Sequence, residues 1–186
     1  MRDAFAANPA TFGGFVARIA ADGRSATGTA TLVDATTLAL LHAHVARVAV
    51  RAPADALAAL IEALAGLPAP PDIALVEGHG TADVRDTGIA MRFGEATGLP
   101  CIGVDTVVPP GLASRTKLHD MRGAFTPLRD GPRQVGWLMR SRVGCDPLVI
   151  SPGHGVALAS APQLVLRCVR DDRLPEPLRL ARPALE

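Results

Sequence analysis

The segment Pro71–Gly80, with the sequence PDIALVEGHG, constrains the fold of this 186-residue chain more than any other. Its apolar run Ile73–Val76 predicts a short buried strand. Two glycines flank His79 and predict a sharp turn directly after the strand, because glycine adopts backbone conformations that other residues avoid. Glu77 and His79 are therefore expected at a strand end, where a carboxylate and an imidazole are suited to metal binding or proton transfer.

The composition predicts one packed domain over residues 1–186, since 48% of the residues are hydrophobic. A formal net charge of +1 gives no electrostatic signature of strong, unspecific nucleic-acid binding. No apolar run is long enough to cross a membrane, and the N-terminal sequence has no signal-peptide core. The three cysteines have no CxxC spacing, which is typical of reduced thiols in a cytoplasmic protein.

The order of expected elements is a β-meander followed by alternating helices and strands, which predicts an α/β domain with three layers. Strands are expected at Phe12–Ile19, Ala26–Val33, within Thr37–Val50, and at Ile73–Val76, Cys101–Val104, Gln134–Arg140 and Pro147–Ile150. Helices are expected at Ala54–Leu67, Thr87–Thr97 and Ala161–Arg170. We expect Val107–Arg133 to form a long surface excursion. In the Pro-rich tail, an ion-pair clamp is expected from Arg173, Glu176 and Arg179.

Three segments in order, at residues 71–104, 135–155 and 173–181, resemble the endonuclease V family, whose members cut nucleic acid beside deaminated adenine. The family has Asp-Gly-His-Gly where this chain has Glu77-Gly-His-Gly. It also has a Ser-Pro-Gly-His turn, found here at 151–154, and a Pro-Glu-Pro tail motif, found here at 175–177. The resemblance implies a ribonuclease H-like fold: a mixed central sheet that starts with an antiparallel meander and has helices on both faces.

The resemblance also implies a catalytic set of an Asp on the first strand, a Glu at the start of the first long helix and the Asp before Gly-His-Gly, assisted by a Lys and a His. This chain retains Glu77 in place of the third carboxylate and His154 in place of the His. Val16, Ala52 and Thr106 stand at the other positions. Since Mg²⁺ needs several oxygen ligands, these replacements predict the loss of standard Mg²⁺-dependent cleavage.

A rebuilt metal site remains open as an alternative. Asp55 lies one helical turn beyond Ala52, and Asp105 ends a strand beside that of Glu77, so these three carboxylates are candidate ligands for Mg²⁺ or Mn²⁺. Asp34 could approach from the meander. In the other interpretation, Asp55 and Asp105 are ordinary cap or turn residues, and the sequence then predicts no cofactor. The expected substrate-binding residues are Gly78, Gly80, Arg51, Asp105 and Thr106.

Three catalytic or ligand-binding functions are compatible with these residues, beside a fourth in which the chain is a non-catalytic scaffold or partner-binding domain. The first is an endonuclease V relative that has lost Mg²⁺-dependent cutting and keeps a Glu/His pocket for a nucleotide or single-stranded nucleic acid. The second is an enzyme recruited to a small molecule, with Glu77, His79 and His154 as its catalytic acid–base residues. The third is a divergent but active endonuclease that cuts inosine-containing DNA or RNA.

Overall fold

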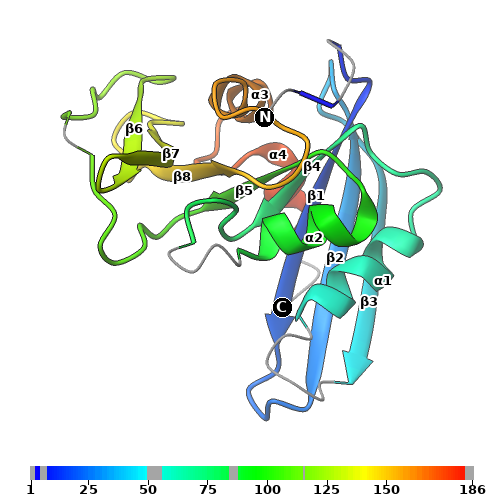
Figure 1. Cartoon of the computed structure of the whole chain (residues 1–186). Coiled ribbons are helices and arrows are strands. Elements are labelled where there is room, and N and C mark those ends of the chain that lie inside the picture. The colour runs from blue at the N-terminus through cyan, green and yellow to red at the C-terminus, as the bar shows by residue number, and fades with distance from the viewer. Residues whose placement is uncertain (1–2, 5–7, 50–55, 84–87, 115, 183–186) are drawn as a thin grey trace.

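The computed structural model describes residues 3–4, 8–49, 56–83, 88–114 and 116–182. These residues form one eight-stranded mixed sheet and four helices (Figure 1). The strands are β1 (Thr11–Ile19), β2 (Ser25–Asp34), β3 (Leu40–Ala49), β4 (Ile73–Glu77), β5 (Cys101–Asp105), β6 (Phe125–Asp130), β7 (Arg133–Met139) and β8 (Leu148–Pro152). The helices are α1 (Ala56–Ala65), α2 (Ile89–Thr97), α3 (Ala161–Arg167) and α4 (Glu176–Ala181).

The sheet has the strand order β3-β2-β1-β4-β5-β8-β7-β6. Strands β1, β2 and β3 form the expected antiparallel meander, and β4 and β5 then continue the sheet in parallel with β1. Strand β8 returns antiparallel to β5, and β6 is the far edge. Figure 1 shows a strongly twisted sheet, with β6–β8 turned crosswise to β1–β3. Because β1, β4 and β5 are neighbours that run in parallel, their carboxyl ends lie at the same edge of the sheet.

Helices cover both faces of the sheet, so the predicted three-layer α/β arrangement is confirmed (Figure 1). Successive residues of a strand point to opposite faces. In β4, Ile73 and Leu75 pack toward α3 and α4, whereas Ala74 and Val76 pack toward α1 and α2. This alternation explains why β4 is apolar at every position before Glu77.

One expectation from the sequence is wrong, and one helix was not predicted. The segment Val107–Arg133 is not surface excursion throughout, because it contains β6. Pro127 interrupts the apolar pattern there, but an edge strand tolerates proline, and Thr126 and Leu128 are still buried. The tail also forms a short helix, α4, which begins at Glu176 with a proline in its first turn, where the missing N–H is harmless.

No helix in the described part of the chain is long and apolar enough to span a membrane.

The expected clamp in the tail forms in part. Arg179 binds the buried carboxylate of Glu176 at 2.7 Å, whereas Arg173 donates to the carbonyl oxygens of Thr106 and Pro147 instead.

Candidate functional site at the carboxyl ends of β1, β4 and β5

The turn after β4 requires glycine on both sides of His79. Gly78 has φ +122°, a conformation that residues with a Cβ rarely adopt, and a Cβ there would lie 2.6 Å from Ile89. Gly80 lies against the backbone of Pro152, so that a Cβ would overlap its carbonyl oxygen. The Gly80 N–H donates to Ser151 Oγ at 2.8 Å. The turn is therefore held against β8, and the backbone fixes the position of His79.

The carboxylate of Glu77 is bound by two arginines that the sequence motifs do not indicate. Arg18 Nη2 donates to both carboxylate oxygens at 3.0 Å, and Arg182 Nη2 donates to Oε1 at 2.7 Å. Arg18 lies near the end of β1, which runs parallel to β4, and Arg182 directly follows α4. We refer to Glu77, Arg18 and Arg182 as the Arg–Glu–Arg cluster.

His79 and Asp105 form a second group on the other face of the sheet. Val104, which pairs with Glu77 in the β4–β5 register, packs in the core layer that includes α4. The next residue, Asp105, therefore points toward α1 and α2. Its Oδ2 lies 3.4 Å from His79 Nε2, and the buried His79 Nδ1 has no hydrogen-bond partner in the described part of the chain.

His154 lies near the opposite end of β5 from Asp105. Its backbone N–H contacts Cys101 Sγ at 3.3 Å, and its carbonyl oxygen accepts from the Cys101 N–H at 2.8 Å. Cys101 and Asp105 are the first and last residues of β5, about 13 Å apart at the usual rise of a strand. The structure thus brings His79 to Asp105 but places His154 elsewhere.

The remaining candidate residues are spread around the site. The Thr106 N–H donates to Asp105 Oδ1 at 2.6 Å, so Asp105 also supports the backbone at the end of its strand. Asp34 pairs with Thr11 at the beginning of β1, the end remote from Glu77, and it binds the turn between β2 and β3. Arg51 and Asp55 lie outside the described residues.

The donors around Glu77 do not fit a divalent metal ion. Mg²⁺ and Mn²⁺ need several oxygen ligands. On β1, Val16 directly follows Phe15, the partner of Val76, and its apolar side chain is fully buried in the core. Both oxygens of Glu77 already accept from guanidinium groups, whose positive charge opposes a nearby cation. Among the described residues, no group of three or more His, Cys, Asp or Glu side chains is arranged to hold a metal.

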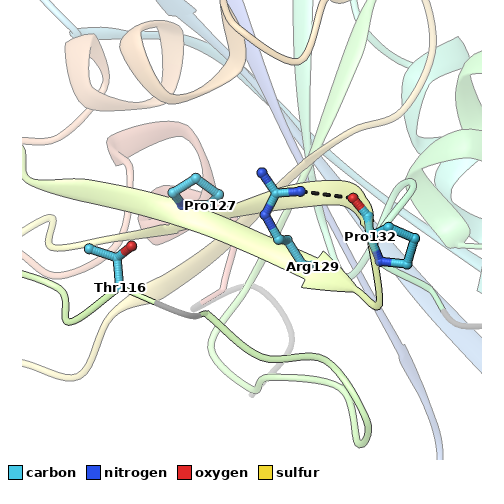
Figure 2. Close-up of a pocket in the computed structure, with 4 residues that line it drawn as sticks. All are labelled: Thr116, Pro127, Arg129 and Pro132. Carbon is cyan, nitrogen blue, oxygen red and sulfur yellow. Dashed lines mark hydrogen bonds between the residues drawn. The ribbon is translucent and has the colours of Figure 1, made fainter.

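A separate pocket of about 470 Å³ lies at the far edge of the sheet, beside β6 (Figure 2). It is lined by Thr116, Pro127, Arg129 and Pro132. Arg129 Nη1 donates to the carbonyl oxygen of Pro132 at 2.8 Å, as Figure 2 shows. Strands β5, β8 and β7 separate this pocket from β4, so it is distinct from the site at Glu77.

Sequence reasoning missed Arg18 and Arg182 for different reasons. Arg18 is two residues beyond Val16, so strand alternation places both on one face, and this pattern was available in the sequence. Arg182 is 105 residues from Glu77, and its position depends on the unpredicted helix α4. No local signal in the sequence indicates that contact.

A sheet of this topology, with polar side chains where β1, β4 and β5 end, defines a ribonuclease H-like protein. The family model described as Endonuclease V matches residues 13–182, and the chain belongs to the endonuclease V family. It is 41% identical to Endonuclease V of Xanthomonas axonopodis pv. citri, an alignment that covers 96% of this chain and 78% of the relative. These matches confirm the resemblance and the fold expected from the sequence.

Two solved structures extend the comparison. The catalytic domain of human endonuclease V matches with a TM-score of 0.89 and 28% identity, over 98% of this chain and 86% of the other. The fold is also similar to that of endonuclease V of Ciona intestinalis, solved in complex with a 23mer DNA containing an inosine followed by a ribo-adenosine. That match has a TM-score of 0.78 and 18% identity, and it covers 99% of this chain and 88% of the other.

Proposed function

We infer that this chain binds nucleic acid that contains a deaminated purine, at the strand ends around Glu77, without using Glu77 as a ligand of a catalytic metal. Membership of the endonuclease V family supports a nucleic-acid partner. So does the inosine-containing DNA bound by the Ciona intestinalis relative. The observation that carries the proposal is the engagement of both Glu77 oxygens by Arg18 and Arg182.

The chemistry of phosphodiester cleavage explains why Glu77 is not proposed as a ligand of a catalytic metal. A metal ion in such a site activates water and neutralises charge that develops on the phosphate. In the described part of the chain, Val16 has no side-chain oxygen, and the charge of Glu77 is neutralised by arginine. At the adjacent ends of β1 and β4, the described residues therefore offer one carboxylate for a metal, and both of its oxygens are bound by arginine.

Cleavage of inosine-containing DNA or RNA is the second candidate, and the relatives favour it. The Xanthomonas axonopodis pv. citri protein bears the name of the enzyme and is 41% identical over 96% of this chain. Nothing in the comparisons indicates a loss of activity. This candidate requires Glu77 to leave its arginines and to share a metal with other carboxylates, of which Asp55 lies outside the described residues.

An acid–base enzyme for a small molecule is less well supported by the geometry. That function needs Glu77, His79 and His154 in one cleft. His79 instead contacts Asp105, and His154 lies beside Cys101 near the other end of β5.

The deciding experiment combines binding and cleavage. Fluorescence anisotropy measures the affinity for single-stranded DNA and RNA that contain one inosine, against otherwise identical strands with adenine. Each strand is tested with EDTA, Mg²⁺ or Mn²⁺, and gel electrophoresis of the same samples detects cleavage. Calorimetry with each metal ion reports direct metal binding.

The proposal expects preferential binding of the inosine strands in EDTA, with no cleavage under any condition. Metal-dependent cleavage that is abolished by Glu77→Ala would establish the second candidate instead. Equal, weak binding of inosine and adenine strands would overturn the proposed recognition of a deaminated base.

A further inference from the structure

The Arg–Glu–Arg cluster holds more positive than negative charge. Two guanidinium groups share one carboxylate, and each guanidinium has five N–H donors. Glu77 accepts from one terminal nitrogen of Arg18 and one of Arg182. The buried Nε of Arg182 has no hydrogen-bond partner in the described part of the chain. That atom is buried and out of reach of a ligand, and Arg18 Nη1 donates to the carbonyl oxygen of Ala17 at 2.8 Å. The N–H groups left for a second anion are therefore those of the exposed guanidinium edges that neither Glu77 nor Ala17 accepts from.

The cluster is also open to a ligand. The side chains of Arg18 and Arg182 are 49% and 36% exposed, whereas that of Glu77 is only 18% exposed. Glu77 is therefore the least exposed member of the cluster, and its arginines present more of their surface to solvent. The carboxyl ends of parallel strands are the usual position of ligand sites in α/β sheets.

We propose that Arg18 and Arg182 form a metal-independent phosphate site, in which Glu77 is an internal anion that competes with the incoming phosphate. The proposal rests on the proposed function for the source of the phosphate, which is a phosphodiester of nucleic acid. Guanidinium forks match the geometry of phosphate oxygens and bind them bidentately. The two arginines thus give the cluster a net positive charge at the end of β4.

If Glu77 competes with the phosphate, removing its charge should strengthen binding of nucleic acid. Removing its charge with Glu77→Gln keeps the shape of the side chain and releases the arginines, so the affinity for an oligonucleotide in EDTA rises about tenfold. A metal ligand would behave in the opposite way, because its removal would weaken any metal-dependent binding.

Variants of Arg18 and Arg182 test whether these two side chains bind the phosphate. Arg18→Gln and Arg182→Gln each lower the affinity for the oligonucleotide in EDTA about tenfold. The slope of log affinity against log salt concentration becomes shallower by about 0.7 for each phosphate of a single strand that the variant no longer neutralises. Arg129→Gln, beside the β6 pocket, removes the same charge far from Glu77 and leaves both quantities unchanged. Circular dichroism and melting temperatures of all variants report whether they fold.

Inorganic phosphate separates this inference from the proposed function. Phosphate binding to the native state raises the melting temperature, and we expect a larger rise in Glu77→Gln and a smaller one in Arg182→Gln than in the wild type. If phosphate behaves in this way but no oligonucleotide binds, the phosphate site stands and the proposed function fails. If inosine strands bind but Glu77→Gln weakens their binding, or phosphate stabilises no variant, the inference is overturned and the proposed function survives.

Discussion

At the scale of single residues, the three cysteines have different surroundings and should differ in reactivity. Burial raises the pKa of Cys101 to about 12, and burial also raises the pKa of Cys168, whereas Cys145 is only partly buried. Because the thiolate is the reactive form, we expect one thiol of the native protein to react quickly with a disulfide reagent near pH 8. Cys145→Ser should abolish this fast phase, and two or more fast equivalents would contradict the prediction.

Asp34 provides a test of pH dependence. Hydrogen bonds from the backbone N–H and hydroxyl of Thr37, and then from the N–H of Thr36, lower its pKa below the ordinary value of 3.8. Since the folded-state pKa is depressed, the stability that the carboxylate contributes is complete above the unfolded pKa. It is lost as the pH falls through the folded-state value.

We therefore expect the difference in unfolding free energy between wild type and Asp34→Asn to be constant near neutral pH and to shrink below pH 3.8. Urea denaturation over that range measures the difference, and NMR of the side-chain carboxyl gives the folded-state pKa. A midpoint at or above 3.8 would show that the turn does not stabilise the charged form.

At the scale of elements, the contact between β1 and α4 determines where Arg182 lies. Gly14 of β1 faces the backbone of Pro177, so that an added Cβ would overlap its carbonyl oxygen, which also accepts from Thr31 Oγ1 at 2.7 Å. Gly14→Ala should force α4 away from the sheet and lower the free energy of unfolding by about 3 kcal/mol. It should also weaken phosphate binding, because Arg182 follows α4.

Gly131→Ala is the matched control for Gly14→Ala. Gly131 has no heavy atom near its would-be Cβ, and its φ of +54° makes the substitution cost only about 1 kcal/mol of backbone strain. Chemical denaturation should therefore rank Gly14→Ala as clearly more destabilising. Only Gly14→Ala should change the phosphate-induced rise in melting temperature.

At the scale of the whole molecule, one continuous sheet connects the meander to the last strands. Since β4 and β5 join β1 to β8, we expect residues 1–186 to unfold in a single cooperative transition. Trp137, the one tryptophan of the sequence, reports on β7, while far-UV circular dichroism reports on all elements. The two signals should have the same midpoint, and Gly14→Ala on β1 should shift both equally. Separate midpoints would indicate that the two ends of the sheet unfold independently.

Most of the elements could be predicted from the sequence because their signals are local. Apolar runs and glycine turns indicated β1, β2, β4 and β5 within one or two residues. Helical periodicity indicated α1, and the expected helices at Thr87–Thr97 and Ala161–Arg170 overlap α2 and α3. Strand β6 was missed because Pro127 breaks its pattern, and α4 was missed because it has only 6 residues.

The candidate site was predicted only in part, for a physical reason. The sequence by itself determined that Glu77 and His79 lie at a strand end, since a strand followed by a glycine turn is encoded by neighbouring residues. The tertiary structure decided their partners. Arg18 and Arg182 are 59 and 105 residues from Glu77. Pairing of β1 with β4 and packing of α4 on β1 bring these charges together, and such contacts depend on the folded chain as a whole.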